Sequence, residues 1–223
     1  MGKVFSTCRP NDNSRSKQTQ QTDAPRYHNM QEIIDTEKKD ELKKSVDELK
    51  QLVHKGIYLA EEKKKYWVDA EGRNCFKLFP KGLNIIWSED PKYWTWEHFK
   101  DASDKFEAAV LKSVSWLEIM GDLKYSYLTP NVLYQVVFEA KLEEQASGWN
   151  EPVNFMLSKL PDGAVLSKRT EKLEKKGEWL QLVAGEMTAK LDDMAETLQI
   201  CMSEYGGHWK TGLRLAGIKI TPK

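Results

Sequence analysis

Residues 132–142 read VLYQVVFEAKL and show the clearest two-residue periodicity in the chain. Apolar side chains recur at every second position, namely Val132, Tyr134, Val136, Phe138, Ala140 and Leu142. Alternation of this kind is typical of a β-strand that buries one face. The preceding residues 129–131, Thr-Pro-Asn, have the composition of a turn. The segment therefore predicts a long strand that lies against a hydrophobic core.

Shorter strands are predicted on both sides of this segment, separated by turns rich in Gly, Pro, Asn and Asp. They cover residues 66–68, 75–79, 83–87, 110–119, 153–157, 179–183, 197–202 and 213–220. In the last of them, the parity of the apolar positions changes near Ala216 and Gly217, which predicts a β-bulge. Residues 99–108 and 168–176 are charged and are predicted to be irregular. Because no helical period is interleaved, the pattern predicts an all-β, antiparallel β-sandwich of jelly-roll type.

The N-terminal part has a different composition. Residues 1–28 are polar, and we expect a disordered tail because too little apolar surface is available for a core. Residues 29–55 carry apolar side chains at spacings of three and four, which predicts one amphipathic helix that ends near Gly56. We expect this helix to pack on the domain rather than to serve a dedicated partner. A charged linker follows, so the predicted segments are tail 1–28, helix and linker 29–65, and β-sandwich 66–223.

Composition narrows the choice of partners and compartment. Lys+Arg and Asp+Glu both number 34 among 223 residues, which argues against nucleic acid as the main partner. The three cysteines form no CxxC pair and do not indicate a disulfide scaffold, although Cys8 is a candidate for an intermolecular disulfide. No apolar run has the length of a signal peptide or a membrane span, so we expect a cytoplasmic protein. The start, Met-Gly-Lys-Val-Phe-Ser, fits both the N-myristoylation pattern and a plain solvated tail.

Recognised catalytic motifs are missing from the sequence. The four histidines are isolated, and no HExxH, P-loop, GxSxG or zinc-ligand spacing occurs. Glu118 and Glu204 lie in predicted strands, where a carboxylate usually faces solvent. A glycosidase pair would require a separation between carboxylates that sequence does not supply. We therefore expect a protein that is not an enzyme and that uses no metal or cofactor.

Aromatic residues give the stronger signal. Residues 82–96 read GLNIIWSEDPKYWTW, in which Trp87 and Trp94 bracket a polar turn. Aromatic faces beside polar groups suit pyranose rings, whose C–H faces stack while their hydroxyl groups are hydrogen-bonded. We therefore predict that Trp87 and Trp94 stack on a sugar or shape its site. The polar partners predicted for that sugar are Tyr93, Ser88 and Glu204.

Other aromatic residues are assigned differently. Trp116 and Trp179 stand among apolar residues in predicted strands, and we expect both in the core. Trp96 is expected to anchor the loop. Tyr205 and Trp209 flank a Gly-Gly turn and form a second aromatic group.

Several ordered motifs resemble the phloem protein 2 family of plant lectins, the Nictaba-like group. They are IIWSEDPKYWTW at 85–96, VSWLEIMG at 114–121, LTPNVLY at 128–134, FEAKL at 138–142, WKTGL at 209–213 and GIKITP at 217–222. The likeness covers about residues 66–223. GIYL at 56–59 and YWVD at 66–69 are similar to the longer, cucurbit-like members from phloem sap.

This resemblance implies a non-enzymatic, cytoplasmic lectin of phloem sieve elements and companion cells, with roles in defence and wound response. It implies a homodimer that binds N-acetylglucosamine oligomers, such as chitooligosaccharides and the N-glycan core of glycoproteins. Two tryptophans and a glutamate that the family uses for sugar binding fall on Trp87, Trp94 and Glu204. A second acidic position of the family falls on Thr197, with Glu196 beside it, which leaves the second carboxylate unassigned.

Two other functions stay open on the sequence. Phloem members are linked to RNA transport, which the neutral net charge supports poorly. They are also linked through disulfides to filament proteins of the sieve element. The thiols available for such links are Cys8, Cys75 and Cys201.

Overall fold

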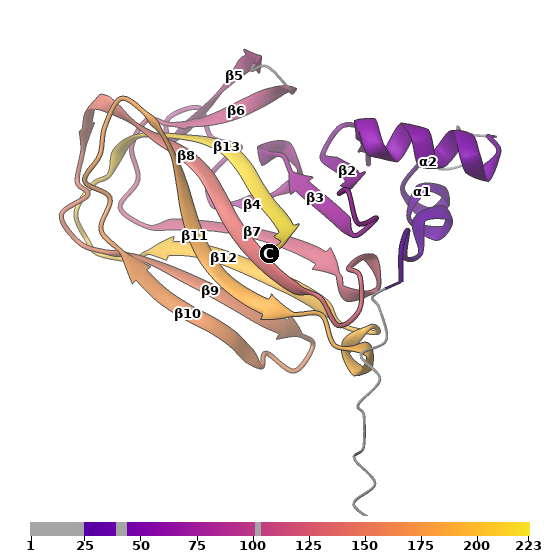
Figure 1. Ribbon diagram of the computed structural model, residues 1–223. Coiled ribbons are helices and arrows are strands. Elements are labelled where there is room, and N and C mark those ends of the chain that lie inside the picture. Colours follow the sequence, from indigo (N-terminus) through magenta and orange to yellow (C-terminus); the bar gives the residue numbers. More distant parts are fainter. Residues whose placement is uncertain (1–24, 39–43, 101–103) are drawn as a thin grey trace, which may run out of the picture.

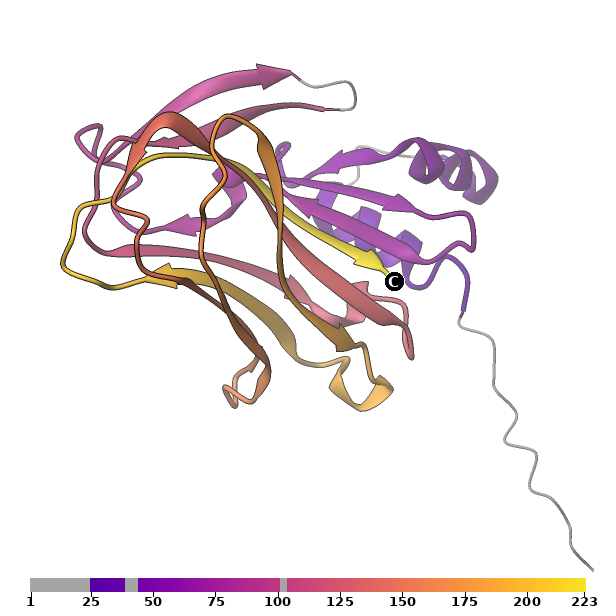
Figure 2. The ribbon, with the colours of Figure 1, turned by 60° about the vertical axis from the view of Figure 1, so that its left-hand side comes forward.

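In the computed structural model of the protein, two antiparallel β-sheets pack face to face and two helices lie beside one edge (Figures 1 and 2). The structure describes residues 25–38, 44–100 and 104–223. This arrangement confirms the predicted antiparallel β-sandwich. Within the described residues, no helix is long and apolar enough to cross a membrane.

The large sheet has eight strands. They are β1 (Ile57–Leu59), β2 (Lys64–Val68), β3 (Asn74–Leu78), β5 (Trp94–Lys100), β6 (Lys105–Leu111), β8 (Leu133–Ser147), β11 (Trp179–Thr188) and β13 (Thr211–Pro222). β13 pairs along its length with β8, which pairs with β11. On its other side β13 forks, because residues 214–215 pair with β6 and residues 218–220 pair with β3. Two branches, β6–β5 and β3–β2–β1, therefore leave the same strand.

A bulge in β13 accompanies this change of partner. The register with β8 shifts between Leu215 and Gly217, which confirms the bulge predicted from the parity of the apolar residues. Gly217 has φ +135°, and a Cβ atom there would lie 2.3 Å from the carbonyl oxygen of Leu78. Only glycine allows β3 to approach β13 this closely.

The small sheet has five strands in the order β10–β9–β12–β7–β4. They are β4 (Asn84–Ile85), β7 (Leu117–Lys124), β9 (Val153–Leu160), β10 (Val165–Glu171) and β12 (Thr197–Glu204). Short 3₁₀ turns, η1 (Pro80–Gly82), η2 (Tyr125–Tyr127) and η3 (Leu191–Asp193), connect the strands. In Figure 1 this sheet lies below the large one, and β10 comes close to β11 at one side of the sandwich.

The hydrophobic core fills the space between the sheets. The alternating residues of β8 face it, as the sequence predicts, and Tyr134, Val136 and Phe138 are fully buried. The ring centroid of Phe138 lies 5.6 Å from that of Phe155 on β9 of the opposite sheet. Aromatic contact across the layers fixes how the two sheets face each other.

The N-terminal segment forms two helices, α1 (Met30–Lys38) and α2 (Val46–Lys55), so the prediction of one helix over 29–55 is wrong. The cause is Ser45, which has extended backbone angles and begins α2 with a capping box to Glu48. The predicted C-terminal end at Gly56 is confirmed. The buried apolar residues of the two helices, Met30, Ile33, Ile34, Leu49 and Val53, join the main core. The helices therefore pack on the domain, as expected.

A buried asparagine joins this segment to the sandwich. Asn74 on β3 is fully buried, and its Nδ2 donates to the carbonyl oxygens of His28 (2.7 Å) and Tyr127 (2.8 Å). Its Oδ1 accepts from the hydroxyl of Tyr66 at 2.9 Å, and its backbone N–H donates to Thr129 Oγ1 at 2.9 Å. The side chain is thus fully hydrogen-bonded, as a buried amide requires.

Several predicted boundaries differ from the structure. Residues 25–28 belong to the described fold rather than to a tail, since Tyr27 N donates to Gly72 O at 2.8 Å. The predicted tail is otherwise outside the described residues. The linker contains β1, and residues 99–108 contribute to the β5–β6 hairpin instead of an irregular segment. Residues 165–171 form β10, and the predicted strand 110–119 is divided between β6 and β7.

Candidate functional site

Three loops lie side by side at one end of the small sheet, where the arrow of β12 ends on the left of Figure 1. They are residues 86–93, 112–116 and 205–210, and they follow from the pairing of β4, β7 and β12. Lys112 N donates to Tyr93 O at 2.8 Å and joins the first loop to the second. Val114 and Lys210 exchange backbone hydrogen bonds of 3.0 and 2.7 Å and join the second loop to the third. We call this surface the loop end.

The exposed aromatic residues gather on the loop end. Trp87 is 59% exposed, Trp116 51%, Tyr205 47% and Trp209 57%. Within the described part of the chain, these are the exposed residues among Phe, Trp and Tyr. Trp116 was expected in the core, and that prediction is wrong because β6 ends at Leu111 and β7 begins at Leu117. A group of exposed rings on one surface is typical of a binding site.

The first loop presents Trp87 and Tyr93. Trp87 has φ +64°, a left-handed conformation that is uncommon for a bulky residue and turns the side chain to solvent. The rings of Trp87 and Tyr93 are 5.7 Å apart, with 50° between their planes. The turn is closed by Asp90, whose carbonyl accepts from Tyr93 N at 2.9 Å. Ser88 lies half-buried beside Trp87.

Trp94 has a different position from the one predicted for a stacking residue. Only 1% of its surface is exposed, and its Nε1 donates to Ile86 O at 3.1 Å. A ring in this position offers no face to a ligand, so the stacking role is wrong. The hydrogen bond spans the loop and fits the alternative role of shaping it. Trp96, predicted as the anchor, is half-buried under Lys81 Nζ, which lies 3.7 Å from its ring centroid.

Glu204 supports the third loop from below. Its Oε1 accepts from Gly206 N at 2.7 Å, and its Oε2 forms an ion pair with Lys210. Lys210 is fully buried and also donates to the carbonyl oxygens of Ser115, Gly206 and His208 at 2.6, 3.2 and 3.1 Å. Both oxygens of Glu204 are therefore engaged, and its predicted direct contact with a sugar is wrong for this conformation.

The second acidic position of the family is far from the loop end. Thr197 and Glu204 begin and end β12, respectively. Glu196, beside Thr197, forms an ion pair with Lys159 at 3.0 Å. Because the strand separates them, residues 196–197 and Glu204 do not face one site.

A second aromatic pair, Trp116 and Tyr205, joins the second and third loops. Their ring centroids are 4.3 Å apart and their planes are inclined by 33°. The hydroxyl of Tyr205 donates to Glu118 Oε2 in a short hydrogen bond. Burial and this bond raise the pKa of Tyr205 to about 12, so the hydroxyl keeps its proton at neutral pH. The sequence does hold a signal for this pair, because Trp116 and Glu118 are two residues apart and therefore lie on the same face of a strand. The predicted strand 110–119 placed Trp116 in the core, and the signal was missed.

The thiols described by the structure are poor candidates for links to other proteins. Cys75 is 2% and Cys201 7% exposed. Burial raises the pKa of Cys75 to about 12 and that of Cys201 to about 11. Neither thiol is placed to reach another protein while the domain is folded, and Cys8 lies outside the described residues.

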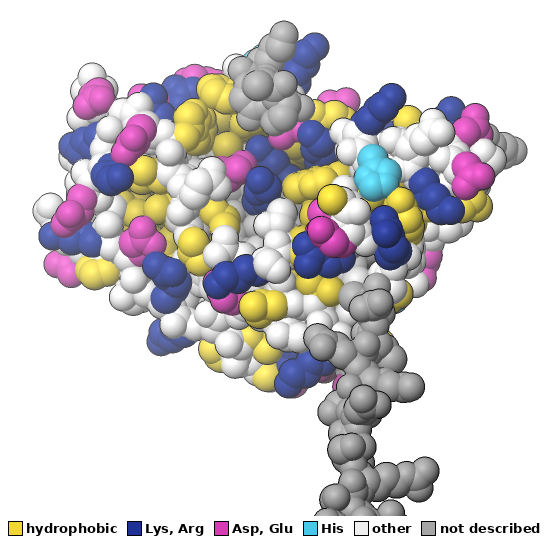
Figure 3. All heavy atoms as spheres, viewed as in Figure 1, with side chains coloured by type: hydrophobic (Ala, Val, Ile, Leu, Met, Phe, Trp, Pro, Cys, Tyr) yellow, Lys and Arg dark blue, Asp and Glu magenta, His cyan; other side chains and the backbone are white. Residues whose placement is uncertain are grey.

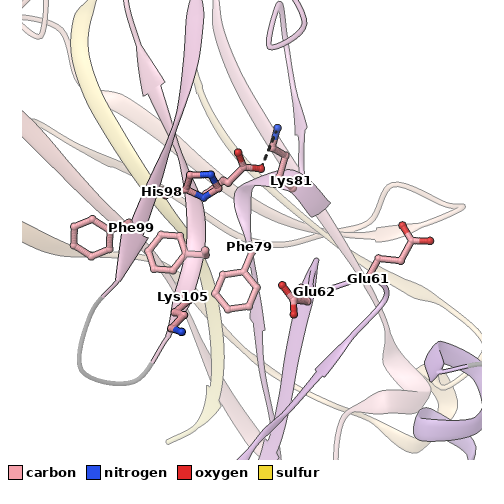
Figure 4. Close-up of a pocket in the computed structure, with 9 residues that line it drawn as sticks. Glu61, Glu62, Phe79, Lys81, His98, Phe99 and Lys105 are labelled. Carbon is pink, nitrogen blue, oxygen red and sulfur yellow. Dashed lines mark ion pairs between the residues drawn. The ribbon is translucent and has the colours of Figure 1, made fainter. Parts of the chain in front are cut away.

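A separate hollow lies on the outer face of the large sheet, between the turn after β1 and the β5–β6 hairpin (Figure 4). Its volume is about 400 Å³. Phe79, Phe99 and Phe106 meet in it, with ring centroids about 5.5 Å apart along the row. Charged residues of both signs surround them, including the ion pair of Lys81 with Glu107 at 3.4 Å. None of the predicted site residues lines it. Over the face viewed in Figures 1 and 3, positive and negative side chains are interspersed.

Comparison with known proteins identifies the family. The family model for phloem protein 2 matches residues 73–222. The chain belongs to the phloem protein 2 family. This phloem protein 2 chain is 40% identical to the Arabidopsis thaliana Protein PHLOEM PROTEIN 2-LIKE A1, over 78% of its own length and 73% of the relative. It is 34% identical to a protein named lectin from Luffa acutangula, over 75% of this chain and 80% of that protein.

Similarity to solved structures is weaker. The xylan-binding domain CBM22-2 of Paenibacillus barcinonensis Xyn10C is similar over 64% of this chain and 92% of that chain, with a TM-score of 0.38 and 13% identity. A likeness at this level does not bear on the ligand. Among the described residues, no group of three or more His, Cys, Asp or Glu side chains is placed to hold a metal ion.

Proposed function

We propose that the protein is a lectin that binds N-acetylglucosamine oligomers, including chitooligosaccharides and the N-glycan core of glycoproteins, through the loop end. The observation that carries this proposal is the gathering of the exposed aromatic residues on three adjacent loops. The names of the Luffa acutangula relative and of a 28% identical Coccinia grandis relative, both lectins, support it. A non-catalytic role in phloem defence and wound response, in the cytoplasm of sieve elements and companion cells, is part of the same proposal.

The residues have distinct roles in this proposal. Trp87 stacks on the apolar face of a pyranose ring. Tyr93 packs against Trp87 and fixes the orientation of its indole ring, while the Tyr93 hydroxyl hydrogen-bonds the sugar. Ser88 contributes a further hydrogen bond. Trp94 and Glu204 hold the loops in place without touching the ligand. Each hydrogen bond contributes about 1 kcal/mol, so micromolar affinity requires contacts with more than one sugar unit.

Titration calorimetry with chitotriose tests the proposal. We expect measurable heat and a micromolar dissociation constant for the wild type, and at least a tenfold weaker one for Trp87→Ala. Leu191→Ala is the matched control, because Leu191 is 60% exposed in η3, beside the start of β12 rather than its end. Absence of binding to chitooligosaccharides by the wild type would sink the proposal.

The other roles suggested by the family remain separate proposals with their own tests. Homodimerisation is tested by sedimentation at several protein concentrations. RNA transport predicts a salt-sensitive gel shift with single-stranded RNA, whereas the neutral net charge argues against nucleic acid as the main partner. A thiol link to filament proteins rests on Cys8 and predicts adducts on non-reducing gels that a Cys8→Ser variant lacks.

A further inference from the structure

The outward face of the small sheet continues from the loop end as an ordered series of rows. Residues paired across antiparallel strands point to the same side of a sheet, and successive rows on that side are two residues apart. Leu117 and Ile119 of β7 are fully buried in the core, so the intervening Glu118 points outward. Trp116 lies two residues before Glu118, toward the loop end, and its side chain points to the same side.

The first row is aromatic and the second is polar. The pairing of Glu204 with Leu117 places Tyr205 opposite Trp116, and these rings form the first row. In the second row, Ser203 pairs with Glu118 on one side and with Asn154 of β9 on the other. Ser203 is only 7% exposed, so this row presents the half-buried carboxylate of Glu118 and amide of Asn154. They follow the aromatic pair at a distance of about 6.7 Å, two residues along the strands.

Glu118 connects the two rows and has one carboxylate oxygen that could accept a hydrogen bond from a ligand. Its Oε2 accepts the hydrogen bond of Tyr205. Its Oε1 has no hydrogen-bond partner among the described residues, and the side chain is only half-buried. Asn154 Nδ2 donates to Ser203 O at 3.4 Å, which orients the amide along the row. The carboxylate is therefore positioned to accept from a hydroxyl or an acetamide N–H of a sugar that lies on the rings.

We propose that Trp116 and Tyr205 form a second sugar-stacking platform, served by Glu118 and Asn154, which extends the lectin site to longer oligosaccharides. The inference rests on the proposed function, since it assigns an additional subsite to the same loop end. One sugar unit stacks at Trp87 and Tyr93, and a later unit of the same chain stacks at Trp116 and Tyr205. Glu118 acts as the hydrogen-bond acceptor of this platform, through the carboxylate oxygen that Tyr205 does not occupy.

Calorimetry with a length series separates this subsite from the first. The ligands are chitobiose, chitotriose and chitopentaose, and the proteins are the wild type, Trp116→Ala, Glu118→Gln and the control Leu191→Ala. We expect wild-type affinity to rise with length, and Trp116→Ala to bind the pentamer at least tenfold more weakly while binding the dimer within about twofold of the wild type. Glu118→Gln should weaken pentamer binding about threefold or more.

The outcomes distinguish this inference from the proposed function. If the wild type binds no member of the series, both fail. If it binds all members equally, or if folded Trp116→Ala and Glu118→Gln keep the wild-type gain with length, the second platform is rejected and the lectin function stands. Circular dichroism checks the fold of each variant, and Glu118→Gln, which preserves size and hydrogen bonding, decides the question if Trp116→Ala does not fold.

Discussion

Lys210 and Glu204 form an ion pair beneath the loop end, with the lysine fully buried and the glutamate 5% exposed. The pair closes the loop that carries Tyr205 and Trp209, and the lysine also ties that loop to Ser115. Desolvation lowers the pKa of Lys210, so its charge depends on the carboxylate and on the three carbonyl groups around it. The exposed rings are thus held by a buried polar contact.

Replacing the lysine should therefore destabilise the protein. We expect Lys210→Met to lower the free energy of unfolding by about 3–5 kcal/mol, because the Glu204 carboxylate is left buried without its partner. Urea denaturation measures the loss. The double variant Lys210→Met with Glu204→Gln should recover part of it, since the unpaired charge is gone. A loss below about 1 kcal/mol in the single variant would show that the pair is not needed.

Replacing Trp94 should destabilise the protein much more than replacing Trp87. Trp94→Ala removes a buried ring and its hydrogen bond to Ile86, and we expect a loss of about 3–5 kcal/mol. Trp87→Ala removes an exposed ring and should change stability by no more than about 0.5 kcal/mol. Thermal and urea unfolding of both variants checks this. Equal losses would contradict the assignment of Trp94 to the loop scaffold.

The buried thiols should make stability fall at high pH. The pKa values of Cys75 and Cys201 are raised from 9.0 to about 12 and about 11, so above pH 9 the unfolded chain releases protons that the folded chain retains. The free energy of unfolding should then decrease by up to about 1.4 kcal/mol per pH unit for each thiol. Cys201→Ala should flatten the slope measured between pH 8 and 9, where the unfolded tyrosines, whose ordinary pKa is 10.0, contribute least.

The same burial predicts low reactivity of these thiols. With a thiol reagent at pH 8, Cys75 and Cys201 should react only after denaturation, because both the thiolate and access to it are disfavoured in the fold. Mass spectrometry of the labelled native protein identifies the modified residue. Rapid modification of Cys201 in the folded protein would show that the small sheet opens readily.

Asn74 should be a critical residue for attachment of the N-terminal segment. Asn74→Ala leaves the hydroxyl of Tyr66 and the carbonyl groups of His28 and Tyr127 without their partner, and we expect a loss of about 3 kcal/mol or more. Asn84→Ala is the control, because Asn84 is exposed on β4. Hydrogen exchange of α1 should accelerate in the first variant only.

The sequence predicted the sandwich because alternation is a local property. Residues 132–142 carry an apolar side chain at every second position, and the residues of that set in β8, from Tyr134 to Leu142, are all buried. Local sequence misplaced both Trp94 and Trp116, because Trp94 follows a polar turn yet is buried, and Trp116 stands among apolar residues yet is exposed. Their exposure depends on where β6 ends and where the first loop folds back, and those positions are set by contacts with other strands.

The hairpin β5–β6 and the strand β10 were missed for a related reason. Phe99 pairs with Phe106, but the residues on either side of each are charged or polar. In the sequence, a short edge strand of this composition resembles a charged loop. Glu204 was placed correctly on a strand. It pairs with the buried Leu117, so its side chain points to the same, inward side of the sheet. The sequence does not show this, because the pairing register depends on a distant strand.

The first strands of the large sheet have a consequence for self-association. The match to the family begins at residue 73, so β1 and β2 precede it, yet β2 pairs with β3 along Asn74–Leu78. All five residues of β3 are buried. Without that pairing, β3 would expose a row of unpaired backbone groups, which is a template for joining chains edge to edge. The hairpin of β1 and β2 therefore covers an edge that could otherwise pair with another chain. A protein that begins at residue 73 should aggregate even where its sugar-binding loops are still folded.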